Sequence, residues 1–121
     1  MRIVNMFWVL VAMAVLCAPA AAIAEPVMPP VAKKSMCTAC HKVDGKLVGP
    51  AFSWIAYKYK DDKKKGKQAI IDQIVNGGSR QWIRYTGGAM MPPLKDQTTE
   101  AERNELADFI LSLEPVAPPE Y

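Results

Sequence analysis

The apolar positions near the end of the chain recur at the spacing of an α-helix. They follow one another at intervals of three or four residues: Leu106, Phe109 or Ile110, and Leu113. Thr99 and Glu102 form the T-x-x-E pattern of a capping box, which predicts that a helix begins here. Pro115 cannot continue a helix, so the helix is predicted to end before it.

Three earlier segments show the same period and predict three more helices: Met28-Pro29-Pro30 to about Thr38, Ala51 to Tyr59, and Lys67 to Asn76. In the third segment the apolar residues are predicted to face inward: Ile70, Ile71, Ile74 and Val75. Gly77-Gly78 is predicted to end this helix. The periodic segments are helical and no alternating strand pattern occurs, so the sequence predicts an all-α domain.

Two stretches lack this periodicity. Asp61 to Gly66 is predicted to be a charged loop, and Gly77 to Gln97 is rich in glycine and proline. An irregular segment as long as the second one is unusual inside a compact domain unless it has a function. We therefore expect functional side chains in this segment.

The first 24 residues have the pattern of a secretory signal peptide. Arg2 supplies a positive charge, Met6 to Ala18 are almost all apolar, and Ala22-Ile23-Ala24 matches an A-x-A cleavage site. Cleavage would leave residues 25–121 as one domain with a proline-rich tail at 115–121. An uncleaved membrane anchor is the alternative, since about 20 apolar residues can span a bilayer.

The predicted mature chain is small and nearly neutral. Removing Arg2 from the 15 basic residues leaves 14, against 12 acidic residues, for a net charge of +2. This charge is too low to indicate nucleic-acid binding. A domain of about 97 residues buries a modest core, so a bound apolar cofactor would contribute to its stability.

Cys37-Thr38-Ala39-Cys40-His41 is the strongest chemical signal, because C-x-x-C-H is the attachment motif for haem c. Two thiols at this spacing can bond the two vinyl groups of a porphyrin, and the histidine that follows can bind the iron. His41 is the only histidine in the chain. The motif predicts one covalently bound haem c held by Cys37, Cys40 and His41.

Two other interpretations of the cysteines fit the sequence less well. A thioredoxin-like pair belongs to a βαβ chain, which this sequence does not resemble. A structural zinc site needs four ligands, and the only other cysteine, Cys17, lies in the predicted leader.

The second axial ligand is predicted to be a methionine, since no second histidine is present. Met91 stands directly before Pro92-Pro93 in the irregular segment, where a rigid turn can present its sulfur. A thioether ligand raises the reduction potential of a haem relative to a second histidine. Met90 remains the alternative ligand.

The ordered motifs resemble those of the short bacterial class I cytochromes c. The matching segments cover almost all of the predicted mature chain: C-T-A-C-H at 37–41, V-G-P-A at 48–51, residues 74–78, Trp82, M-P-P at 91–93 and F-I-L-S-L at 109–113. The resemblance implies the class I cytochrome c fold, with three to five short helices around one haem.

The same resemblance implies roles for further residues. The carbonyl of Pro50 would accept a hydrogen bond from the other ring nitrogen of His41, which orients the imidazole. The indole of Trp82 would donate to a haem propionate. The spacing from Trp82 to Met91 is longer than in the shortest family members, so Arg80 and Arg84 are alternative partners for the propionates.

An iron with two protein ligands has no open position, so the site is expected to transfer one electron and not to be an enzyme. The resemblance implies a monomeric periplasmic carrier between a membrane quinol-oxidising complex and a terminal oxidase, reductase or peroxidase. Membrane contact is expected only through partners or an uncleaved leader. The alternatives are an electron-transfer subunit of a larger dehydrogenase and a haem-based gas sensor.

Transient docking to redox partners is expected to use surface lysines, because a patch of one sign accelerates encounter. Lys42 and Lys46 flank the haem motif and are the stronger candidates. The run Lys63-Lys64-Lys65 with Lys67 is a further candidate, although lysine-rich loops are usually only solvated.

Overall fold

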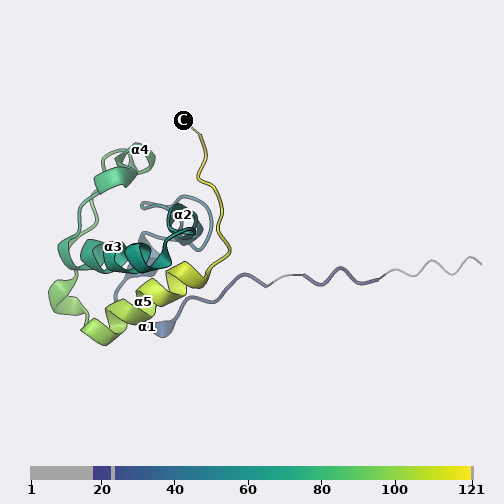
Figure 1. Ribbon diagram of the computed structural model, residues 1–121, viewed down its shortest axis with the longest axis horizontal. Helices are drawn as coiled ribbons and strands as arrows, with labels where there is room; N and C mark the ends of the chain where they lie inside the picture. The colour runs from purple at the N-terminus through teal and green to yellow at the C-terminus, as the bar shows by residue number, and fades with distance from the viewer. Residues whose placement is uncertain (1–17, 23, 121) are drawn as a thin grey trace, which may run out of the picture.

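The computed structural model describes residues 18–22 and 24–120. Most of the predicted signal peptide, Cys17 included, lies outside the described residues. In Figure 1 the described part of the N-terminal stretch runs away from the helical body. No helix in the described ranges is both long enough and apolar enough to cross a membrane.

The described residues fold into short helices joined by loops, with no strand among them. The α-helices are α1 (Pro30–Lys34), α2 (Phe52–Lys58), α3 (Lys63–Asn76), α4 (Ile83–Thr86) and α5 (Glu100–Ser112). Three 3₁₀ turns complete the order: η1 (Cys37–Ala39), η2 (Arg80–Trp82) and η3 (Lys95–Gln97).

Helix α5 is the centre of the packing. It contacts α3 most extensively and also packs against α2 and α1 (Figure 1). Leu106 and Ile110 of α5 meet Ile70 and Ile74 of α3 in the main core, and Leu106 is only 1% exposed. The predicted inward face of α3 is therefore confirmed for its two central isoleucines.

A second, smaller core lies around α4. Trp54 of α2, Trp82 of η2 and Ala51 are buried together, and Tyr85 of α4 packs against them. The Tyr85 ring centroid lies 5.6 Å from that of Trp54 and 5.7 Å from that of Trp82. These aromatic contacts attach α4 to the rest of the domain.

The predicted first helix ends earlier than the sequence analysis placed it. Helix α1 stops at Lys34, and Met36 adopts the left-handed region with φ of 58°. A non-glycine residue in this region breaks the helical path. The chain then turns back into η1, so the prediction of a helix to about Thr38 was wrong.

The predicted charged loop at 61–66 and the start of the third helix at Lys67 were also wrong. Helix α3 begins at Lys63, because the Asp62 carboxylate accepts a hydrogen bond of 3.0 Å from the backbone N–H of Lys65. An N-cap of this kind stabilises the first turn, so the lysine run is helical.

The predicted irregular segment at 77–97 contains three short elements: η2, α4 and η3. Its positive-φ residues include Arg80 at 44°, as well as Gly77, Gly78, Gly87 and Gly88. The segment is thus a series of tight turns, not an extended loop.

The last predicted helix is confirmed. Thr99 accepts from the backbone N–H of Glu102, and Glu102 accepts from the backbone N–H of Thr99, which completes the capping box. The helix ends at Ser112, with Leu113 as its C-cap. Beyond it, the mostly exposed tail is held to α2 by a 3.2 Å hydrogen bond from Val116 N to Ser53 O.

The Thr99 hydroxyl should contribute measurably to stability. Thr99→Ala removes the cap and should lower the free energy of unfolding by about 1 kcal/mol in urea denaturation. Thr99→Ser keeps a hydroxyl at the same position and should stay near the wild-type value. Equal losses in the two variants would contradict a capping role.

Candidate functional site

The C-x-x-C-H motif is wound into one tight turn. The carbonyl of Cys37 accepts hydrogen bonds from Cys40 N at 3.1 Å and from His41 N at 2.8 Å. The turn places both cysteines and His41 in the lining of the same pocket. Cys37 is buried and Cys40 is half-buried, and neither is in a disulfide.

The imidazole of His41 is held by the loop that follows the motif. Its Nδ1 donates a 2.8 Å hydrogen bond to the Pro50 carbonyl. A carbonyl only accepts, so Nδ1 carries the proton and Nε2 keeps a free lone pair. The ring also stacks on Phe52, with centroids 5.0 Å apart and planes at 21°. The predicted contact between Pro50 and His41 is present.

Gly49 lies against the edge of the same ring. A Cβ at this position would be 2.5 Å from Cε1 of His41 and 2.9 Å from Nδ1. Because real contacts of this kind do not occur so close, only glycine fits here without a shift of the imidazole. Gly49, Pro50 and Phe52 thus fix the ring from three directions.

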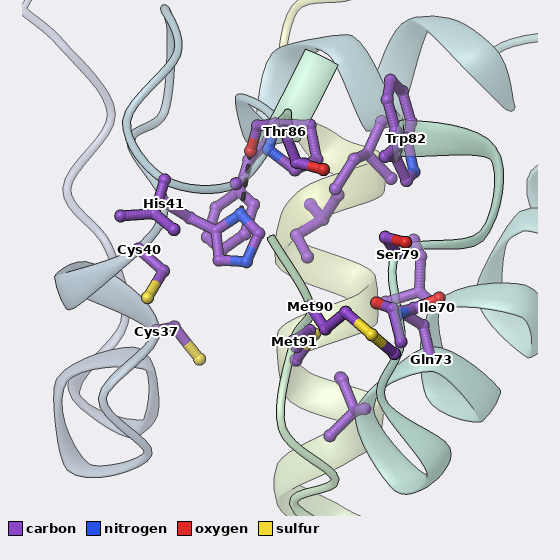
Figure 2. Close-up of a pocket in the computed structure, with 18 of the residues that line it drawn as sticks. Cys37, Cys40, His41, Ile70, Gln73, Ser79, Trp82, Thr86, Met90 and Met91 are labelled. Atoms are coloured by element: carbon purple, nitrogen blue, oxygen red, sulfur yellow. Dashed lines mark hydrogen bonds between the residues drawn. The ribbon is translucent and has the colours of Figure 1, made fainter. Parts of the chain in front are cut away.

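Met91 reaches the pocket from the opposite side. In Figure 2 the two cysteines and His41 lie on one side, while Met90 and Met91 lie across from them. Met91 packs against the main core, whereas Met90 is 72% exposed. Both line the pocket, but only Met91 is anchored by neighbours, so the structure favours Met91 over Met90.

The position of Met91 depends on a backbone pairing with Gly78, two residues after the end of α3. Gly78 N donates to Met91 O at 2.8 Å, and Met91 N donates to Gly78 O at 3.4 Å. At Gly77 a Cβ would lie 2.4 Å from Met91 O. The two segments therefore approach each other so closely that only glycine fits at 77.

The remaining predicted site residues fall into two groups. Trp82 is buried and lines the pocket (Figure 2), and its predicted hydrogen bond to a haem propionate stays a prediction. Arg80 and Arg84 are exposed and are not among the lining residues of the described pocket. A role for them toward a cofactor carboxylate stays a prediction.

Burial sets the electrostatics of the pocket. It lowers the pKa of His41, although the hydrogen bond to Pro50 opposes this effect. It raises the pKa of the Cys37 thiol and of the Tyr59 phenol. The imidazole is therefore favoured in its neutral form, which is the form that binds a metal.

Sequence reasoning missed three residues of the site. Phe52 was assigned to a helical stripe, but not to a stack on His41. Gln73 and Gln81 line the pocket and make hydrogen bonds to Gly78 O and to the Tyr59 hydroxyl, respectively. Nothing in the pattern distinguishes these glutamines from the other polar residues of their segments.

The comparisons with known proteins agree with this arrangement. Residues 31–114 match the family model described as Cytochrome c. Cytochrome c-552 of Nitrosomonas europaea is 42% identical over 82 residues, which are 68% of this chain and 74% of that protein. Cytochrome c-552 of Hydrogenobacter thermophilus is 39% identical over 82 residues, covering 68% and 76% of the two chains.

The chain belongs to the cytochrome c family. The crystal structure of wild-type Nitrosomonas europaea cytochrome c552 superposes with a TM-score of 0.59 at 40% identity, covering 69% of this chain and 95% of that one. The predicted all-α class I cytochrome c fold and the predicted family are confirmed. The homologues are mono-haem, periplasmic cytochromes that act in electron transfer.

Cytochromes c bind one covalently attached haem c, and the cofactor prediction is confirmed. The residues present fit this group. Two free thiols lie on one wall of a largely apolar pocket, and an imidazole with a free Nε2 lies beside them. A thioether enters from the opposite wall (Figure 2).

Gly49→Ala should disturb the imidazole because the added methyl group overlaps it. We expect the Nδ1–H resonance of His41, seen by NMR in the holoprotein, to shift or disappear as the bond to Pro50 lengthens. Gly88→Ala is the control, since a Cβ there meets nothing within 4 Å and only its positive φ is strained. An unchanged Nδ1–H resonance in Gly49→Ala would show that the ring is not confined at this edge.

Proposed function

We propose that this protein is a periplasmic one-electron carrier between a membrane quinol-oxidising complex and a terminal oxidase, reductase or peroxidase. The observation that supports this proposal is the placement of His41 and Met91 on opposite sides of one apolar pocket (Figure 2). Bound haem supplies reversible one-electron chemistry at its iron.

In this proposal, Cys37 and Cys40 would form the thioether attachments, and His41 and Met91 would bind the haem iron. The proton on Nδ1 directs Nε2 of His41 to the metal, and the Pro50 carbonyl makes the imidazole more basic. Met91 is half-buried and packs against the main core, which restricts the movement of its side chain. With two side chains committed to the metal, the site has no position for a substrate.

This arrangement favours a carrier over an enzyme or a gas sensor. Electron transfer needs ligands that move little, and the imidazole is fixed by Gly49, Pro50 and Phe52. A sensor needs a sixth position that is open or occupied by an easily displaced ligand, whereas Met91 is paired through its backbone with Gly78, just beyond α3. A subunit of a larger dehydrogenase would use the same chemistry and remains the second candidate.

Trp82 is proposed as the residue that donates a hydrogen bond to a haem propionate. It is buried at the pocket, and the ammonium of Lys58 lies 5.7 Å from the centre of its ring. A cation here would also favour a carboxylate nearby. Arg80 and Arg84 are both exposed and are proposed as the alternative cations that would neutralise the propionates.

Docking is proposed to be transient and to use Lys42 and Lys46. Both are exposed and neither has a salt-bridge partner among the residues the structure describes. Lys67, in contrast, is paired with Asp108 at 2.8 Å. Free charges next to the motif can steer an acidic partner toward the pocket. We propose that the carrier is monomeric and that no nucleic acid takes part.

Export is proposed to occur with cleavage after Ala24, so that residues 25–121 form the working domain. The described residues that this cleavage removes, 18–22 and 24, are all exposed (Figure 1). Met28, which packs against the main core, stays in the working domain. Mass spectrometry of the exported protein gives the cleavage point.

An optical spectrum of the exported holoprotein tests the central proposal. The oxidised protein should show the weak charge-transfer band from methionine sulfur to ferric iron. Met91→Ala should abolish this band, because it removes the anchored thioether. Met90→Ala is the matched control and should retain the band, since Met90 is 72% exposed.

Two outcomes would overturn the proposal. A high-spin spectrum, or ready binding of carbon monoxide by the wild-type protein, would indicate an open sixth position and favour a sensor or an enzyme. Absence of covalent haem after export with the maturation machinery would contradict the proposal that the protein carries electrons on a bound haem.

Charge reversal tests the docking surface. In stopped-flow reduction by membranes that contain the quinol-oxidising complex, Lys42→Glu combined with Lys46→Glu should slow association about ten-fold at low salt. The paired substitutions Lys64→Glu and Lys65→Glu change the net charge equally and should have a smaller effect. If the second pair slows association more, the surface lies at the start of α3.

A further inference from the structure

Gln73 is a polar side chain in a largely apolar part of the pocket wall. It stands on the last turn of α3, is half-buried, and lines the pocket together with Ile70 (Figure 2). Its Nε2 donates a 2.7 Å hydrogen bond to the carbonyl of Gly78. This contact has no part in the attachment of haem and needs its own explanation.

The bond is not required to end the helix. The backbone carbonyl of Gln73 already accepts from Gly77 N at 2.8 Å, which closes the last turn. The side chain adds a second bond, one residue further along the chain. It therefore acts on the segment beyond the helix.

That segment is the one that holds Met91. Gly78 O accepts from Gln73 Nε2 at 2.7 Å and from Met91 N at the longer distance of 3.4 Å. Gly78 has φ of +95°, and a Cβ there would meet nothing within 4 Å. The amide of Gln73 supplies a side-chain hydrogen bond that orients the Gly78 carbonyl.

We propose that Gln73 is a positioning residue that holds the Met91 segment closed over the site and so controls how easily Met91 is displaced from the metal. The proposal rests on the axial role of Met91 proposed above. The chain of contacts is short: Gln73 fixes Gly78 O, Gly78 pairs with Met91, and Met91 enters the pocket. Loss of the first contact leaves the pairing to the two backbone bonds alone.

The test is the affinity of the oxidised holoprotein for added imidazole, which binds iron only when Met91 leaves. Gln73→Leu keeps the approximate size of the side chain and removes the donor. It should raise imidazole affinity about five-fold, which is the change expected from the loss of one hydrogen bond. Gln68→Ala is the control, because Gln68 bonds to Asp72 on the exposed side of the same helix. Its affinity should equal that of the wild type.

Gln73→Glu supplies a pH profile that a merely structural role would not produce. The ionised carboxylate would face the Gly78 carbonyl, acceptor against acceptor, so imidazole affinity should exceed that of Gln73→Leu. The protonated acid can donate as the amide does. The affinity relative to wild type at the same pH should therefore fall toward one as pH is lowered through the pKa of the introduced carboxyl.

The outcomes separate this inference from the proposed function. If the Gln73 variants keep the methionine charge-transfer band and bind imidazole as the wild type does, the inference is wrong and the electron-carrier proposal stands. If the wild-type protein lacks the band, the axial role of Met91 fails, and the inference fails with it.

Discussion

The pairing of Gly78 with Met91 is the contact on which the far side of the pocket depends. It can form only because Gly77 has no side chain. A Cβ on Gly77 would lie 2.4 Å from the carbonyl oxygen of Met91, where the two segments meet. Helix α3 delivers these glycines to the right place because Ile70 and Ile74 pack against α5. The packing that forms the core of the domain therefore also places Met91.

Several apolar side chains of the main core also line the pocket. Ile70, Ile74, Leu106 and Ile110 belong both to the main core and to the lining. A domain of this size has few apolar residues to spare, so a large apolar cofactor completes the packing. The position of that cofactor is then constrained by α3 and α5 as well as by the attachment motif.

The sequence predicted the parts of the fold that are coded locally. The capping box at Thr99 and the isoleucine period of α3 are short-range signals, and both helices were found. Helix α4 was missed because its four residues have no strong helical pattern. Tyr85 holds it through contacts with Trp82, which directly precedes the helix, and with Trp54, which lies far away in the chain, in α2. The left-handed Met36 was likewise invisible in the pattern.

The same division applies to the site. Covalent attachment and metal ligation need particular side chains, so Cys37, Cys40, His41 and Met91 could be proposed from residue type and spacing. The groups that orient them are different, because the two acceptors that matter, Pro50 O and Gly78 O, are backbone carbonyls. Every residue carries a carbonyl, so no pattern of residue types identifies one that is fixed in space.

Glycines 49 and 77 are informative for the opposite reason, since their lack of a side chain marks where the backbone comes close to a ligand residue. In this small fold, the chemistry is coded by side chains, and its geometry is set by the backbone that surrounds them.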